Sequence, residues 1–222
     1  MNATNQPRVK ICCISSGDEA ALAIELGAAA LGLVSHMPSG PGVIPEDLIA
    51  EIAATVPPAV GSFLLTSRQD ASAIIEQHRR CRTNCIQLVD RLQPGSHQCL
   101  RGALHGISLI QVIHVTGPES VDEALAVAPY VDAILLDSGN QALPVKELGG
   151  TGRTHDWTLS RRIREQLPIP IFLAGGLNYS NVRQAIDEVG PFGLDLCSGV
   201  RTGGKLDRAK LAAFFAAVHS VD

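Results

Sequence analysis

Residues 170–200 read PIFLAGGLNYSNVRQAIDEVGPFGLDLCSGV. Two short aliphatic runs flank an amphipathic segment in this stretch; in chain order the three parts span residues 170–174, 181–189 and 193–197. The apolar residues of the middle part recur at helical spacing, whereas the flanking runs have the length and composition of buried strands. The stretch therefore predicts a strand, a helix and a second strand, the repeating unit of a parallel α/β sheet.

The same alternation extends over the rest of the chain. Further strands are expected at residues 9–14, 30–34, 60–65, 85–89, 109–115 and 133–137. Further helices are expected at residues 18–26, 45–55, 71–80, 97–105, 157–166 and 207–218, and another at a capping box formed by Ser120 and Glu123. Eight units in 222 residues give about 28 residues each, close to the usual repeat of a (β/α)8 barrel.

We therefore predict an α/β protein with a single (β/α)8-barrel (TIM barrel) domain over residues 1–222. The alternative is an open, doubly wound sheet. No Gly-x-Gly-x-x-Gly motif follows the first strand, which counts against that alternative.

The composition excludes several classes of function. Hydrophobic residues make up 45% and charged residues 18% of the chain, and the formal net charge is -4. A chain with this charge offers no broad basic surface, so we expect no nucleic-acid partner. No apolar run reaches the roughly 18 residues of a membrane span, and residues 1–10 lack the apolar stretch of a signal peptide. We expect a cytoplasmic protein with no membrane partner.

The six cysteines are scattered along the chain, and we expect them to be free thiols in a reducing cytosol. Cys81 and Cys85 have a spacing that occurs in some metal sites. No second pair and no histidine cluster accompany them in the sequence, so we predict no metal site.

Candidate catalytic residues should lie at the carboxyl ends of the strands, where (β/α)8 barrels carry their active sites. Cys12 lies near the end of the first strand and Lys10 precedes it by two residues, so both side chains share one face. If this face points inward, the Lys10 ammonium would favour a Cys12 thiolate that can act as a base. The alternative is a buried, apolar cysteine. Cys13, on the opposite face, should pack against the helices.

Asp137 closes the apolar run of the sixth strand. A carboxyl group at this position suits proton transfer, although a helix cap or turn role is the alternative. Residues 138–156 then form the longest connection, whose length is typical of a lid or a mobile segment. Gly149-Gly150-Thr151-Gly152 within it could hinge a lid or approach a ligand, or could simply be flexible.

Glycine turns follow the last two strands, at Gly175-Gly176 and Ser198-Gly199. Backbone amides in these two loops, with a helix N-terminus, form the usual phosphate site of such barrels, and the alternative is that the glycines only close tight turns. Gln87 and His114 are polar residues within strands. For His114 we favour a satisfied core histidine, and for Trp157 a packing anchor of its helix.

Several of these segments occur together in one known family. They are Lys10-Ile11-Cys12-Cys13-Ile14-Ser15, Gln87-Leu88, Leu135-Leu136-Asp137-Ser138, Gly149-Gly150-Thr151-Gly152 with Asp156-Trp157, Leu173-Ala174-Gly175-Gly176-Leu177, and Asp195-Leu196-Cys197-Ser198-Gly199-Val200. In this order the chain resembles the phosphoribosylanthranilate isomerases of tryptophan biosynthesis over nearly its whole length.

The resemblance implies an aldose–ketose isomerase that needs no cofactor and performs an Amadori rearrangement on a small phosphorylated sugar amine. It implies that Asp137 protonates the ribose ring oxygen as general acid, that the ring opens to a Schiff base, and that Cys12 removes the C2 proton as general base. The phosphate would be bound by Gly175, Gly176, Ser198 and Gly199, and the substrate further supported by Lys10, Gln87, Gly150 and Thr151. We expect a monomer or a homodimer.

The chain departs from the family pattern at the anthranilate end of the site. The family arginine that engages the anthranilate moiety is replaced by Pro41, and the histidine of Gln-Leu-His-Gly by Val89. A glycine of the first motif is replaced by Cys13, and the glutamate after Ser-Gly-Val by Arg201. A charged hydrogen bond contributes about 1.5–3 kcal/mol, so the loss of the arginine weakens the expected contact to anthranilate.

Three hypotheses follow. The first is a phosphoribosylanthranilate isomerase, the second a paralogous isomerase of another phosphorylated sugar amine, and the third a barrel that binds a phosphorylated metabolite without turnover. Cys12 and Asp137 favour an enzyme over a binding module, whereas Pro41 and Val89 favour the paralogue over the parent activity.

Overall fold

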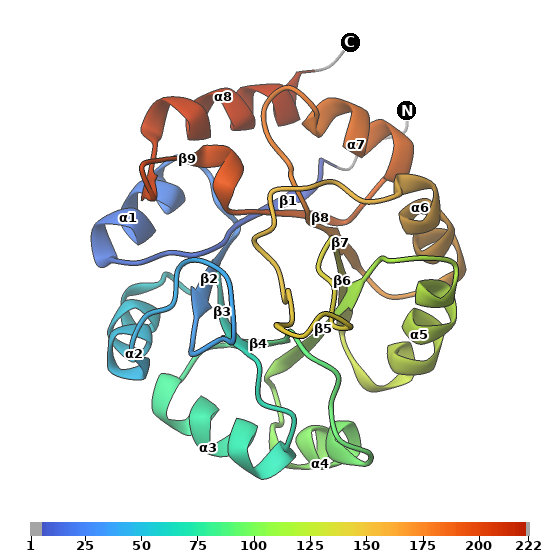
Figure 1. Cartoon of the computed structure of the whole chain (residues 1–222). Helices are drawn as coiled ribbons and strands as arrows, with labels where there is room; N and C mark the ends of the chain where they lie inside the picture. The colour runs from blue at the N-terminus through green and yellow to red at the C-terminus, as the bar shows by residue number, and fades with distance from the viewer. Residues whose placement is uncertain (1–5, 221–222) are drawn as a thin grey trace.

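The computed structural model describes residues 6–220, which form a closed barrel of eight parallel strands inside a ring of helices (Figure 1). The barrel strands are β1 (Arg8–Ile11), β2 (Ala30–Val34), β3 (Gly61–Thr66), β4 (Cys85–Leu88), β5 (Ser108–His114), β6 (Ala133–Asp137), β7 (Ile171–Leu173) and β8 (Gly193–Leu196). The helices are α1 (Gly17–Glu25), α2 (Glu46–Thr55), α3 (Ala71–Cys81), α4 (Ser96–Ala103), α5 (Glu119–Val127), α6 (Trp157–Gln166), α7 (Val182–Val189) and α8 (Arg208–His219).

The predicted (β/α)8 barrel is confirmed, and the open sheet is wrong because β8 pairs with β1 and closes the ring. Two expectations fall partly on residues 1–5 and 221–222, which lie outside the described residues. They are the absence of a signal peptide and the extent of the domain over residues 1–222. None of the helices in residues 6–220 combines the length and hydropathy that crossing a bilayer requires.

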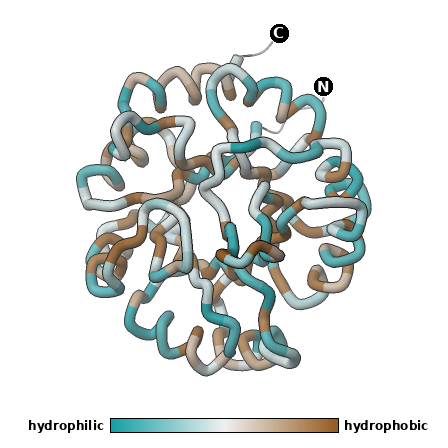
Figure 2. The backbone as a smooth tube through the Cα atoms, in the orientation of Figure 1, coloured by the Kyte–Doolittle hydropathy of each residue, from teal (hydrophilic) through white to brown (hydrophobic). Residues whose placement is uncertain are grey.

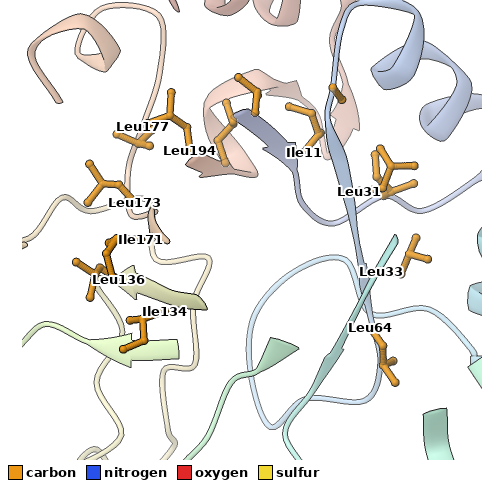
Figure 3. Packing of buried hydrophobic residues seen from close by; sticks show 14 of the residues in the cluster. Ile11, Leu31, Leu33, Leu64, Ile134, Leu136, Ile171, Leu173, Leu177 and Leu194 are labelled. Carbon is orange, nitrogen blue, oxygen red and sulfur yellow. The ribbon is translucent and has the colours of Figure 1, made fainter. Parts of the chain in front are cut away.

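Alternation along the strands divides the apolar residues into two clusters. One side of each strand packs against the helices, and Figure 3 shows this layer with Ile11, Leu31, Ile134, Leu136 and Leu173 among its members. The other side fills the barrel interior with a second, smaller cluster. The tube in Figure 2 is brown along much of the barrel wall, whereas its hydrophilic stretches gather on the surrounding helices and loops. A side chain at the end of a strand therefore enters the barrel mouth or the helical layer according to its parity.

The capping box predicted at Ser120 and Glu123 is wrong. Helix α5 begins at Glu119 directly after Pro118, so Ser120 lies inside the first turn. Its hydroxyl donates a hydrogen bond to the His114 carbonyl oxygen at 3.3 Å instead of capping the helix. Pro118, which directly precedes the helix, already has helical backbone angles, and no side chain caps this end of α5.

A short insertion follows β8. It consists of a 3-10 turn, η2 (Ser198–Val200), and a small antiparallel pair, β9 (Arg201–Thr202) and β10 (Lys205–Leu206). A second 3-10 turn, η1 (Ala128–Tyr130), extends α5. The insertion after β8 positions Arg201 beside the carboxyl end of β1.

Candidate active site

A cavity opens at the carboxyl end of the barrel, where (β/α)8 barrels bind their ligands. Of the residues singled out in the sequence, its wall contains Cys12, Gln87, Asp137, Gly150, Thr151, Gly175, Gly176 and Ser198. Lys10 is completely buried below the wall. Gly199 lies behind it, since a β-carbon there would be 2.0 Å from the Leu177 carbonyl oxygen.

Cys12 projects into the cavity from the end of β1. The strand ends at Ile11, but the Cys12 amide still donates to the Leu196 carbonyl oxygen at 2.8 Å, which keeps Cys12 aligned with β8. Its side chain is 7% exposed and lies on the same face as Lys10. A β-carbon at Gly32 would lie 2.9 Å from both the Cys12 sulfur and the Lys10 nitrogen, so only glycine leaves both groups in place.

Lys10 is held by an ion pair rather than by the thiol. Its ammonium lies 2.8 Å from an Asp195 carboxylate oxygen and 5.3 Å from the centre of the Phe63 ring. Burial alone would lower the pKa of Lys10, but the Asp195 carboxylate outweighs it and raises the pKa above its usual value. Lys10 therefore stays a fixed positive charge beneath Cys12.

Asp137 ends β6 with its side chain facing the cavity. Ala133 and Leu135, four and two residues earlier, belong to the barrel interior, so the parity of the strand also points Asp137 inward. One carboxylate oxygen accepts from the Ser138 amide at 2.7 Å. Burial raises the pKa of Asp137, and the Asp195 carboxylate raises it further. The group is thereby biased toward its protonated, proton-donating form.

The glycine corners bring backbone close to the cavity. Gly175 and Gly176 adopt φ angles of 86° and 64°, in the left-handed region that favours glycine. A β-carbon at Gly176 would lie 2.8 Å from the Arg153 carbonyl carbon. Within residues 6–220, the amides of Gly175, Gly176 and Ser198 donate to no other residue, so these donors are available at the cavity wall.

The long loop between β6 and α6, gold in Figure 1, lies over the barrel centre in that view. The Ser39 hydroxyl donates to the Lys146 carbonyl oxygen at 2.6 Å, and the Lys146 ammonium lies 2.6 Å from Asp90. A β-carbon at Gly150 would lie 2.5 Å from Pro41. The loop is thus packed against the loops after β2 and β4, and its role as a lid stays a prediction.

Two polar side chains in the strands lack partners among the described residues. The Gln87 carbonyl oxygen is buried at the cavity wall without a hydrogen bond. His114 donates through Nε2 to the Val89 carbonyl oxygen at 3.1 Å, whereas its Nδ1 has no partner among the described residues. The expected core position of His114 is confirmed by its burial, but its hydrogen bonding is satisfied only at Nε2. Trp157 packs against the core, as expected, although its indole nitrogen is also unpaired.

The expectation that Cys13 packs among the helices is wrong. Its φ angle of 62° reverses the local direction of the chain, and its side chain joins the interior cluster and lines the cavity. Sequence reasoning also missed Asp195 and Cys197, which line the same cavity from β8. Both would have followed from period-two alternation in residues 193–197, because Leu194 and Leu196 face the helices.

Arg201, another departure from the family pattern, is tied down beside β1. It pairs with Glu19 at 2.8 Å, with both side chains at most 12% exposed. Burial by itself would raise the pKa of Glu19, but hydrogen bonds from Arg201, Leu206 and Ser15 lower it to about 2. The ionised carboxylate therefore stabilises the fold at neutral pH.

Glu19→Gln is expected to reduce the free energy of unfolding by about 2–4 kcal/mol near pH 7, because it leaves Arg201 without its partner. The lowered pKa means that wild type has the Glu19 contribution above the ordinary value of 4.5 and loses it toward about pH 2. Urea unfolding from pH 7 to pH 3 should show the difference shrinking with acidity. Glu25→Gln, which breaks the exposed pair with Arg208, should cost much less. A difference that does not depend on pH would contradict this assignment.

The closed barrel and the cavity at its carboxyl end, with a thiol and a carboxyl group in its wall, define a (β/α)8-barrel enzyme. The model of one family, described as N-(5'phosphoribosyl)anthranilate (PRA) isomerase, matches residues 9–217. The chain therefore belongs to the N-(5'-phosphoribosyl)anthranilate isomerase family, which confirms the family and the kind of enzyme predicted from the sequence.

Individual relatives agree with this assignment. The N-(5'-phosphoribosyl)anthranilate isomerase of Halorubrum lacusprofundi is 34% identical over 211 residues, which cover 94% of this chain and 95% of the relative. The Thermotoga maritima enzyme has a structure with a TM-score of 0.80 at 30% identity, covering 96% of this chain and 98% of that one. Another isomerase structure, a complex with reduced 1-(o-carboxyphenylamino)-1-deoxyribulose 5-phosphate, has a TM-score of 0.77 at 29% identity, with coverage of 96% and 98%.

Proposed function

We propose that the chain isomerises N-(5'-phosphoribosyl)anthranilate to 1-(o-carboxyphenylamino)-1-deoxyribulose 5-phosphate, a step of tryptophan biosynthesis. The observation that carries the proposal is that Cys12 of β1 and Asp137 of β6 face one cavity, which glycine corners border on another side. The complex of a related isomerase with a reduced form of this product supports the choice of substrate.

Asp137 is the general acid in this proposal. Its buried carboxyl group, with its raised pKa, donates a proton to the ribose ring oxygen, and the C1–O bond breaks to give a Schiff base between C1 and the amine. Cys12 then removes the proton from C2, and the resulting enolamine tautomerises to the ketose. The proton balance needs no oxidant and no metal, because hydrogen only moves from C2 to C1.

The amides of Gly175, Gly176 and Ser198 are proposed to bind the substrate phosphate, with Gly199 fixing the backbone of the second corner. Free backbone N–H groups can bind an anion at a cavity wall that contains no lysine or arginine side chain. Lys10, Gln87, Gly150 and Thr151 take supporting roles. Lys10, in its ion pair with Asp195, is a buried positive charge beneath Cys12. The unpaired Gln87 oxygen can accept a hydrogen bond from a substrate hydroxyl or amine.

A paralogous isomerase of another sugar amine is the second candidate, and one observation favours it. Within residues 6–220, no lysine or arginine lines the cavity, and Pro41 and Val89 occupy the positions of the family arginine and histidine. The carboxylate of anthranilate therefore meets no side-chain cation in the wall. Weakened binding of that carboxylate would leave room for other N-substituents.

Pro41→Arg is expected to lower KM for N-(5'-phosphoribosyl)anthranilate by about tenfold, because a charged hydrogen bond to the carboxylate contributes about 1.5–3 kcal/mol. KM for the analogue made from aniline, which lacks the carboxylate, should not change. Steady-state kinetics on both substrates measure the effect. Equal changes for the two substrates would show that the substitution acts through the loop and not through the carboxylate.

The activity itself is tested by following the fluorescence of N-(5'-phosphoribosyl)anthranilate as the enzyme consumes it. Turnover supports the first candidate, and turnover of the aniline analogue alone supports the paralogue. Binding of the reduced product analogue without turnover of either substrate would replace both with a metabolite-binding barrel. We further propose a cytoplasmic monomer or homodimer that binds no nucleic acid, and light scattering in solution tests the oligomeric state.

A further inference from the structure

Three thiols meet where β1 and β8 end. Cys12 and Cys197 directly follow Ile11 and Leu196, which are paired across the two strands, so the two cysteines occupy neighbouring positions on the rim. Cys13 lines two neighbouring pockets together with Cys197, so its thiol lies in the same cluster. All three are free thiols and all three line the cavity. The acid–base mechanism proposed above uses only Cys12.

The backbone is arranged to hold Cys13 in this cluster. Its left-handed φ of 62° turns its side chain over the cavity mouth, where strand parity alone would have sent it toward the helices. Gly42 packs directly against it, since a β-carbon there would lie 2.4 Å from the Cys13 β-carbon and 3.0 Å from its sulfur. A non-glycine residue held in this conformation signals a constrained site.

Arg201 supplies a positive charge to the same cluster. Its guanidinium donates to the Cys13 carbonyl oxygen at 2.6 Å and to the Cys12 carbonyl oxygen at 3.3 Å. The side chain is 8% exposed, and its buried Nε has no oxygen or nitrogen partner among the described residues. The neighbouring Cys13 thiol and the Arg201 charge lower the pKa of Cys197, whereas the neighbouring Cys12 and Cys197 raise the pKa of Cys13.

The two sulfurs differ in access and in pKa. Cys13 is only 5% exposed, so an oxidant reaches it poorly. The lowered pKa of Cys197 favours the thiolate that attacks an oxidant. Cys197 is half-buried and also lines a second pocket with Cys13, Ser15 and Arg201. A small oxidant can therefore reach Cys197 from a side of the rim other than the substrate cavity.

We propose that Cys197 and Cys13 form an oxidant-responsive thiol pair that closes to a disulfide and reversibly switches off the site. The oxidant is hydrogen peroxide. The Cys197 thiolate attacks one peroxide oxygen, the O–O bond breaks, and hydroxide leaves to become water, which gives a Cys197 sulfenic acid. The Cys13 sulfur, losing its proton, then attacks the Cys197 sulfur and displaces a second water. Two thiols are oxidised and one peroxide is reduced to two waters.

Closing this bond disturbs the neighbouring base. The bond brings the sulfurs of Cys13 and Cys197 to about 2.05 Å, so Cys13 must move, and the peptide bond carries that movement to Cys12. A misplacement of about 1 Å costs on the order of 100-fold in rate at a catalytic group. A thiol reductant reverses this effect.

The test treats the full-length protein with hydrogen peroxide, blocks the remaining thiols and maps the disulfides by mass spectrometry of peptides. We expect a Cys13–Cys197 disulfide and a loss of turnover of about 10- to 100-fold that dithiothreitol restores. Mapping does not depend on the proposed isomerase activity, so failure of the thiol pair and failure of that activity are distinguishable. A Cys12–Cys13 bond, or no disulfide while Cys12 alone is oxidised, would overturn the proposal.

Cys197→Ser and Cys13→Ser are compared with Cys99→Ser, which removes an exposed thiol on α4. Each protein is measured against its own untreated sample, and circular dichroism confirms that it is folded. The two rim variants should lose activity to peroxide without recovery in dithiothreitol, because Cys12 is then oxidised beyond the sulfenic acid. Cys99→Ser should recover like wild type. Full recovery of activity by Cys197→Ser in dithiothreitol would contradict the role of Cys197 in the thiol pair.

Discussion

Asp137→Asn is expected to lower kcat/KM for N-(5'-phosphoribosyl)anthranilate by at least about 100-fold, because a positioned proton transfer contributes about 10²- to 10⁴-fold. Asparagine keeps the size of the side chain and can still accept from the Ser138 amide, but it has no proton to give to the ribose oxygen. The raised pKa of Asp137 also implies that wild-type activity falls as rising pH deprotonates this acid. The residual activity of the variant should not show this fall with rising pH.

Asp132→Asn is the matched control, because Asp132 precedes the same strand at the opposite end of the barrel. Its carboxylate accepts from Arg101 and from the Leu109 amide, both at 2.8 Å, far from the cavity wall. Its kcat/KM should stay close to wild type. Both variants should still bind the reduced product analogue, measured by its fluorescence. An Asp137→Asn enzyme that kept more than about a tenth of wild-type kcat/KM would reject the acid role.

Cys12→Ser should reduce kcat/KM by a similar factor, at least about 100-fold, since an unactivated hydroxyl is a far weaker base than a thiolate at neutral pH. No nearby lysine can take over, because Asp195 holds Lys10 in its charged form. The smaller serine also leaves the contact with Gly32 unstrained. Turnover in deuterated water should show the C2 proton no longer being exchanged.

Cys85→Ser is the control for the thiol, because Cys85 lies at the amino end of β4, at the opposite end of the barrel from the cavity. It should keep wild-type turnover and the exchange of the C2 proton. If Cys12→Ser also exchanged that proton at the wild-type rate, another group would have to be the base, and the mechanism would need a new assignment.

The period of the apolar pattern was enough to predict the barrel. Every predicted strand has a counterpart in β1 to β8, and α6 has the predicted bounds, residues 157–166. Strand ends were less predictable, since residues 12–14 continue an apolar run but do not pair as a strand. The positive φ angle of Cys13 interrupts the regular strand there, although the Cys12 and Ile14 amides still donate to Leu196 and Gly32 of the neighbouring strands.

The candidate site was only partly predictable. Asp137 could be placed because it terminates an apolar strand whose alternation is unbroken. Cys13 could not, since one positive φ angle reverses the side-chain direction that alternation predicts. The pairing of Lys10 with Asp195 joins residues 185 positions apart, and no local pattern carries that information.

The eightfold alternation, the family and the residue types at the strand ends could all be predicted, because they depend on local periodicity and on short motifs. Which side chains share a cavity depends on the folded barrel. Its closure places β8 beside β1, and with it Cys197 beside Cys12, and Arg201 beside Glu19. Closure is a long-range event that depends on the packing of all eight strands together, so it leaves no signature in any one segment.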